Sequence, residues 1–410
     1  MINKIIQEHS LNIKFSSVIS AIVMLYLFVA VNDIVLLPFG LLWIKNTLFF
    51  LMFFGVSMSC GVKSRQYLAY MFIVGFLFIY SFAVSIFYDN DLDYIFQENL
   101  SLLIALVVPL LVLSWVGVDH EKIKKISQVF LWAIVFATFH KVLFVIYMDG
   151  YLAISFLDYL FQDLLGRGKI GDIERLNTGN QLLVSLALFI AYRYFAVGYQ
   201  RGFMCVVFSS CIINIYLASS RFFTPVTFIL MGLIVLFDKK AKFMNKFIYA
   251  GIFFLLSFYL GYDLLSSREM SNEVFDIGYE YRINQSAFLF KSFVDAPLFG
   301  KGPGFSINDI DYVLAYAFEN QVLALFAKYG LIGSFIFTCL VAMQFNMFKF
   351  SKSKKEYMLF VLFIILASMF NPYLFGTYAA WAFSFILIIS YLFDEKNRQM
   401  ISVSPKFRDA

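Results

Sequence analysis

The sequence predicts an all-α polytopic membrane protein, because apolar residues are abundant, charged residues are scarce, and the apolar residues gather in long runs. Of the 410 residues, 61% are hydrophobic and 14% are charged, whereas roughly a quarter of a soluble domain is charged. Many runs reach about 20 residues, the length that an α-helix needs to cross a bilayer. We therefore expect a single transmembrane domain over residues 1–410.

About 12 runs satisfy this length criterion, and we expect each of them to form a transmembrane helix. They lie at 16–36, 41–61, 66–87, 98–118, 127–148, 179–197, 203–220, 222–238, 246–265, 321–346, 357–374 and 375–393.

The distribution of basic residues orients these helices. With the N-terminus in the cytoplasm, 21 of the 32 Lys and Arg residues fall on the cytoplasmic side and nine fall outside. Short cytoplasmic loops carry such an excess of basic residues. We therefore expect both termini in the cytoplasm and two long loops outside, at 149–178 and 266–320, each with amphipathic helices.

Several function classes are disfavoured by the composition. The net charge of +5 is divided across the membrane, so no nucleic-acid partner is predicted. The four cysteines fall in predicted spans and the three histidines are scattered, so we expect no metal and no cofactor.

Asp91-Leu92-Asp93 and Asp309-Ile310-Asp311 match the DxD motif of metal-dependent sugar-nucleotide transferases. Both lie outside, where sugar nucleotides are not expected, and we interpret them as solvated acids.

Polar residues within the predicted spans are concentrated in the outer halves. Ionisable groups within a membrane are costly and tend to mark function. This bias predicts a cavity that opens to the outer leaflet. For Lys45 and Lys141 the alternative is a side chain that extends to the headgroups, and for His140 it is a packing role. The residues are Lys45, His140, Lys141, Asn180, Gln181, Asn214, Lys328 and Asn371.

Three outer arginines are candidates for binding an anion, because the planar guanidinium grips phosphate through paired donors. Arg221 lies in a turn with almost no loop around it, and Arg282 lies in an amphipathic segment. For Arg175 a role in topology is an equal alternative.

The second outer loop contains a glycine-rich turn and a carboxylate. Gly300, Gly302 and Gly304 alternate with Lys301 and Pro303, a pattern that can form an anion-binding nest of backbone N–H groups but also occurs in ordinary turns.

Glu319 and Asn320 stand where the loop returns to the membrane. Glu319 is a candidate general base if burial raises its pKa. An acid placed at a helix start by the helix dipole is an equal alternative.

These residues resemble the shared pattern of O-antigen polymerases and O-antigen ligases, bacterial integral-membrane glycosyltransferases with lipid-linked donors. The pattern comprises Arg282, the turn PLFGKGPGF at 297–305 and the segment ENQVLALFAKYGLIG at 319–333. The pair Ser220-Arg221 is similar to the family's serine–arginine turn. Ligases typically have His where this chain has Glu319, which favours the polymerase branch.

The resemblance implies a metal-independent enzyme of the bacterial cytoplasmic (inner) membrane whose site faces the periplasm. Its substrate would be an oligosaccharide on undecaprenyl diphosphate, polymerised into a surface polysaccharide such as O-antigen or capsule. Arg221 and Arg282 would hold the diphosphate, and Glu319 would deprotonate the acceptor hydroxyl. A separate chain-length regulator is a possible partner. The alternatives are an O-antigen ligase acting on lipid A-core and, from another class, a flippase of lipid-linked oligosaccharides.

Overall fold

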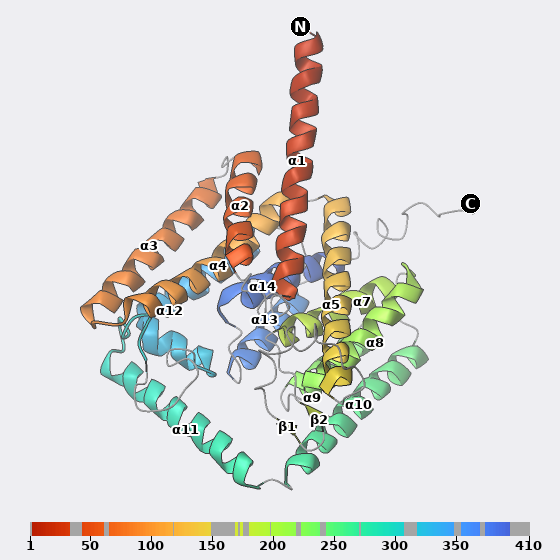
Figure 1. Cartoon of the computed structure of the whole chain (residues 1–410), viewed down its shortest axis with the longest axis vertical. Coiled ribbons are helices and arrows are strands. Elements are labelled where there is room, and N and C mark those ends of the chain that lie inside the picture. Colours follow the sequence, from red (N-terminus) through yellow and green to blue (C-terminus); the bar gives the residue numbers. More distant parts are fainter. Residues whose placement is uncertain are drawn as a thin grey trace.

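The computed structural model describes most of the chain as helix. The described residues are 2–32, 43–60, 65–117, 119–148, 169–170, 173–174, 180–196, 198–218, 223–237, 243–269, 272–306, 318–347, 354–369 and 374–393. Within them lie 13 helices and one pair of short strands (Figure 1). The helices are α1 (Ile2–Val31), α2 (Trp43–Cys60), α3 (Arg65–Phe87), α4 (Leu92–Val116), α5 (His120–Met148), α7 (Gln181–Ala196), α8 (Arg201–Ala218), α9 (Phe223–Phe237), α10 (Phe243–Glu269), α11 (Asn272–Asp295), α12 (Gln321–Met347), α13 (Lys354–Ser368) and α14 (Gly376–Phe393).

Five of these helices are long and apolar enough to cross a membrane, namely α3, α4, α5, α8 and α12. Shorter apolar helical stretches of 10–17 residues lie in α1, α7, α9, α10, α13 and α14. These lengths indicate a multi-pass membrane protein. Each of the predicted spans coincides with a helix, which confirms the all-α class, while the number of crossings and their direction stay predictions.

Three helices, α4, α7 and α14, form the centre of the bundle. In α4, 78% of the residues in the most apolar 18-residue stretch are buried, compared with 28% in α3. The helix α14 packs against both α4 and α7 and lies near the middle of the view in Figure 1, whereas α3, α10 and α11 lie at the rim. A helix that is apolar on all sides belongs in such an interior.

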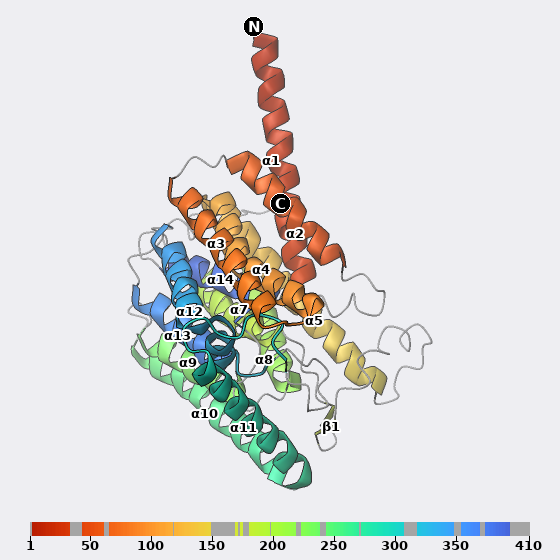
Figure 2. The same ribbon diagram turned by 90° about the vertical axis from the view of Figure 1, so that its left-hand side faces the viewer.

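The rim helices expose large apolar side chains to their surroundings. Phe72 on α3 and Phe258 on α10 are 77% and 74% exposed. Water does not favour a continuous apolar surface of this kind, whereas lipid does. Figure 2 also shows the N-terminal part of α1 projecting beyond the other helices.

The two predicted outer loops differ in the structure. In the first, the described residues form an antiparallel pair of strands, β1 (Lys169–Ile170) and β2 (Ile173–Glu174), and the helix expected in this loop stays a prediction. The rest of that loop lies outside the described residues. The second loop contains a helix, α11, as predicted.

Most of the described polar residues of the predicted outer halves are buried, while Asn371 lies outside the described residues. Lys141 is 2% exposed and its Nζ donates to Oδ1 of Asn214 at 2.7 Å. Asn214 in turn donates to Oγ1 of Thr138 at 3.1 Å, which joins α5 to α8. Lys141 therefore does not extend to the headgroups, and Lys141, Asn214 and Thr138 lie in a packed interior.

Candidate functional site

The second of the predicted outer loops meets the helical bundle at a break in α12. Gly330 has φ 62° and ψ −168°, which interrupts the helix between Tyr329 and Leu331. A positive φ of this kind is strained for other residues and costs glycine little. The break leaves N–H and C=O groups without their helical partners, and apolar surroundings make such groups expensive.

The glycine-rich turn supplies those partners. The N–H groups of Lys301 and Gly302 donate to the carbonyl oxygens of Ala327 and Lys328 at 2.9 and 2.8 Å. On the other side of the break, two α12 N–H groups donate to carbonyl oxygens of the turn. These bonds run from Leu331 to Pro297 at 2.9 Å and from Ile332 to Leu298 at 3.2 Å. The turn and the broken helix therefore form one hydrogen-bonded unit.

The close approach of the two backbones explains why the turn is rich in glycine. A Cβ on Gly300 would lie 2.4 Å from the carbonyl oxygen of Lys328, and one on Gly302 would lie 2.6 Å from Cα of Ser85. Both residues also have positive φ, 73° and 81°. Side chains at these two positions would push the turn away from α12 and α3.

The corner between α3 and α4 holds the turn from the opposite side. The Nδ2 group of Asn90 donates to the carbonyl oxygens of Lys301 and Pro303 at 2.8 and 2.9 Å. Tyr80 on α3 donates through its hydroxyl to the carbonyl oxygen of Phe299 at 2.9 Å. Three helices thus converge on a turn of fewer than ten residues.

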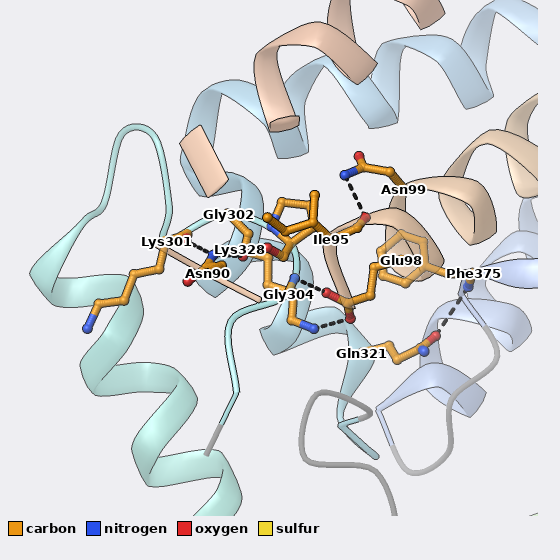
Figure 3. Close-up of polar contacts among 11 residues, drawn as sticks. Asn90, Ile95, Glu98, Asn99, Lys301, Gly302, Gly304, Gln321, Lys328 and Phe375 are labelled. Carbon is orange, nitrogen blue, oxygen red and sulfur yellow. Dashed lines mark hydrogen bonds and ion pairs between the residues drawn. The ribbon is translucent and has the colours of Figure 1, made fainter. Parts of the chain in front are cut away.

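A buried ion pair lies beneath this turn (Figure 3). Glu98 on α4 pairs through Oε1 with Nζ of Lys328 on α12, and the two side chains are 16% and 4% exposed. The other carboxylate oxygen, Oε2, accepts from the N–H of Gly304 at 2.6 Å. Both oxygens of Glu98 are therefore used within the chain. We call Glu98 and Lys328 the inner pair.

Aromatic side chains connect the inner pair to the surface. Nζ of Lys328 lies 4.5 Å from the ring centroid of Phe318, a cation–π distance. Phe318 contacts Phe305 of the turn at 6.3 Å between centroids, and Phe305 stacks on Phe288 of α11 at 5.3 Å with an interplanar angle of 4°. This small apolar cluster attaches α11 and the start of α12 to the turn.

Arg282 and Glu319 meet above that cluster. Nε of Arg282 lies 2.5 Å from Oε2 of Glu319, and the side chains are 52% and 36% exposed. The backbone N–H of Glu319 donates to Oε1 of the buried Gln285 at 2.9 Å, which fixes the peptide that carries the carboxylate. We call Arg282 and Glu319 the outer pair. The structure thus brings together two predicted site residues that are 37 positions apart.

The residues after Glu319 start the helix. Oδ1 of Asn320 accepts from the N–H of Leu323 at 3.0 Å, so Asn320 caps α12. The side chain of Glu319 pairs with Arg282, and Asn320 rather than Glu319 caps this helix terminus. Gln321 accepts from the N–H groups of Leu374 and Phe375 and joins α12 to the start of α14.

Lys301 lies apart from the inner pair. Its Nζ is 3.1 Å from Oδ2 of Asp295 at the end of α11 and 5.5 Å from the centroid of Phe305. In Figure 3 its side chain points away from Glu98 and Lys328. The ammonium group therefore remains on the side of the turn that α11 covers.

The interpretation of the turn as an anion-binding nest is corrected by these contacts. The N–H groups of Gly300, Lys301 and Gly302 donate to backbone carbonyls of the chain, and that of Gly304 donates to Glu98. The anion at this nest is the protein's own carboxylate. Gly300, Gly302 and Gly304 position the site, and their N–H groups are used by the chain itself.

Two further predicted residues, Arg175 and Arg221, lie outside the described residues. Asp91 of the first DxD motif caps α4, since its Oδ1 accepts from the N–H groups of Asp93 and Tyr94 at 2.9 and 3.3 Å. In the described part of the chain, no three His, Cys, Asp or Glu side chains gather as metal ligands.

Sequence reasoning missed Glu98, Asn90 and Tyr80, and it identified Lys328 without its partner. One signal was available for Glu98, because it is an acid at the edge of a predicted span and such groups are usually paired. For Asn90 and Tyr80 the sequence carries no such signal, since their role depends on which turn packs against α3 and α4.

The chain was compared with protein-family models, with curated proteins and with solved structures, and none of them matches it.

Proposed function

We propose that the protein polymerises oligosaccharide repeat units linked to undecaprenyl diphosphate, at the outer leaflet of the bacterial cytoplasmic membrane. The observation that carries the proposal is the outer pair. Arg282 and Glu319, which the family resemblance singles out, lie in contact on the same face of the loop. The proposal includes about 12 membrane crossings, cytoplasmic termini and an outward-facing site.

Arg282 is suited to hold the donor diphosphate. Its guanidinium carries five N–H donors, and its contact with Glu319 runs through Nε. The side chain is 52% exposed, so a phosphate group reaches it from the surface. A diphosphate carries more negative charge than a carboxylate and accepts paired hydrogen bonds from the guanidinium. Donor binding is therefore expected to draw Arg282 away from Glu319.

Glu319 then acts as the general base. While it is paired with Arg282, its Oε2 atom is occupied by the guanidinium. Transfer of Arg282 to the diphosphate frees that oxygen to accept a hydrogen bond from the acceptor when the donor is in place. The carboxylate takes the proton of an acceptor sugar hydroxyl, whose oxygen attacks the anomeric carbon of the donor. The bond from that carbon to the diphosphate breaks, and undecaprenyl diphosphate leaves with the electron pair.

Other predicted residues extend the diphosphate site. Arg221 supplies a second guanidinium in this proposal, while Arg175 and Lys301 supply further positive charge at its margin. Asn320 and the glycines of the turn hold the outer pair in place through the helix cap and the bonds to α12. A chain-length regulator would contact the polymerase from outside this site.

Deletion of the gene, followed by gel analysis of lipopolysaccharide or capsule, tests the reaction class. A product with a single repeat unit on its acceptor supports the polymerase. Lipid-linked polymer that never reaches lipid A-core would instead indicate a ligase, and repeat units trapped on the cytoplasmic side would indicate a flippase.

Complementation with site variants tests the outer pair. Arg282→Ala and Glu319→Gln are each expected to lower polymer by roughly a hundredfold or more, the usual effect of losing a charge-stabilising or acid–base group. Lys291→Ala is the matched control, because Lys291 is an exposed cation on the same helix. Normal polymer in both site variants, at normal protein level, would refute the assignment.

A further inference from the structure

A groove lies near the N-terminal ends of α5 and α8, far from the outer pair in the sequence. Its volume is about 400 Å³. The lining residues come from α1, from α5 and from the start of α8 with the residue before it: Met24, Lys125, Gln128, Val129, Trp132, Gln200 and Phe203. Nothing in the proposed catalytic reaction uses these residues.

The helices that form this groove run in the same direction. Gln128 on α5 bonds to Tyr199 and Gln200 just before α8, and further along α5 Lys141 bonds to Asn214. The first turns of both helices therefore lie at one end of the bundle. By the distribution of basic residues this end is predicted to be cytoplasmic.

The groove changes from polar to apolar along α5. Its four lining residues on this helix, 125, 128, 129 and 132, have the spacing of one helical face. Lys125 and Gln128 lie nearer the N-terminal end, and Val129 and Trp132 lie deeper along the helix. Trp132 is 57% exposed, and its ring centroid lies 4.6 Å from that of Phe203. An amphiphile matches this order better than a wholly polar or wholly apolar ligand.

The polar end of the groove is held together by side-chain hydrogen bonds. Gln128 donates through Nε2 to the hydroxyl of Tyr199 at 2.7 Å and to Oε1 of Gln200 at 3.5 Å. Gln200 has φ 42°, in the left-handed region, which is unfavourable for a non-glycine residue. This turn holds an amide at the groove mouth at a conformational cost.

Positive charge surrounds that end. Lys124 lies with Nζ 4.8 Å from the centroid of Tyr199, and Arg201 is exposed at the first position of α8. The nearest acids in the sequence are Asp119 and Glu121, and Oδ1 of Asp119 accepts from backbone N–H groups at the start of α5. Lysine and arginine at this position attract the anionic headgroups of a membrane surface.

We propose that this groove binds an anionic phospholipid, with the phosphate at Lys125, the glycerol esters near the two glutamines and an acyl chain along Trp132 and Phe203. The apolar wall favours a lipid over free phosphate, because inorganic phosphate gains nothing from contact with Trp132, Val129 and Phe203. The proposal is independent of the proposed polymerase activity.

Native mass spectrometry of the purified protein tests the proposal. Phosphatidylglycerol and phosphatidylcholine with identical acyl chains are added in turn. We expect more retained phosphatidylglycerol in the wild type, and roughly tenfold weaker retention in Lys125→Gln/Trp132→Ala, as loss of one charge-assisted contact predicts. The control Lys246→Gln/Trp43→Ala makes the same chemical changes outside the groove and should retain lipid as the wild type does.

A second measurement does not depend on the double variant. Phosphatidylglycerol with brominated acyl chains should quench tryptophan fluorescence, and Trp132→Phe should remove the headgroup-dependent part of that quenching. Equal retention of both lipids, unchanged retention in the groove variant, or displacement of the lipid by inorganic phosphate would each overturn the proposal.

Discussion

The inner and outer pairs are both glutamate–cation pairs close to Phe318, yet they differ in burial. The side chains of Glu98 and Lys328 are 16% and 4% exposed, whereas those of Glu319 and Arg282 are 36% and 52% exposed. Breaking a buried pair leaves an unpaired charge in apolar surroundings, which is costly. An exposed pair contributes little stability because water solvates both partners. The inner pair is therefore suited to hold the fold, and the outer pair is accessible to a ligand.

The largest effect on stability is expected from the inner pair. Glu98→Ala leaves the Lys328 ammonium buried without its carboxylate, and we expect the free energy of unfolding to fall by about 3–5 kcal/mol. Thermal unfolding of the detergent-solubilised protein measures the change. The double variant Glu98→Leu/Lys328→Met should recover most of the loss, because neither charge then remains. A melting temperature for Glu98→Ala equal to that of the wild type would contradict the structural role.

A smaller effect is expected from the glycine turn. Gly302→Ala places a Cβ within 2.6 Å of Ser85 at a positive φ, and strain of this kind costs about 1–3 kcal/mol. Gly75→Ala is the control, because a Cβ there meets nothing within 4 Å and lies in a regular helix. Melting temperatures of the two variants decide the comparison. Equal values would mean that the turn does not pack against α3 as described.

Asn90→Ala should have a more modest effect than the glycine variant. The change removes hydrogen bonds from Nδ2 to carbonyl oxygens of the turn at 2.8 and 2.9 Å. We expect a loss of about 1–2 kcal/mol, since neutral hydrogen bonds contribute about 1 kcal/mol each. Limited proteolysis of the second outer loop should detect a turn that opens more often. Asn46→Ala, at an exposed position of α2, is the control.

The smallest effect on stability is expected from the outer pair. Arg282→Ala should change the free energy of unfolding by less than about 1 kcal/mol, while polymer synthesis is lost. The exchanged variant Arg282→Glu/Glu319→Arg sharpens the comparison, because it keeps a pair of opposite charges and moves the arginine to another position. Polymer in this variant, scored by gel, would show that the outer pair only supports the fold. We expect none.

The sequence predicted the helices well because each one depends on its own residues. A run of about 20 apolar residues forms a helix in a membrane whatever surrounds it, since the backbone must bond within the segment. Arg282 and Glu319 were predicted as site residues from local features as well. Arg282 is an arginine in a loop that is predicted to lie outside, where arginine is less expected. Glu319 stands where that loop returns to the predicted span. The short strands at 169–174 were missed because strands of two residues carry no periodicity.

The apolar runs determined the all-α fold class, and the charge bias predicts that the loop carrying Arg282 and Glu319 lies outside. Only the tertiary structure decided what the glycine turn binds. The same residues of the turn could present their N–H groups to a phosphate or to the carbonyls of Ala327 and Lys328, and the structure shows the carbonyls as partners. Likewise, Glu98 and Lys328 are 230 positions apart, and their pairing depends on α4 packing against α12. Local sequence encodes the conformation of each segment. The hydrogen-bond and ion-pair partners of each side chain depend on how segments that are distant in the chain pack together.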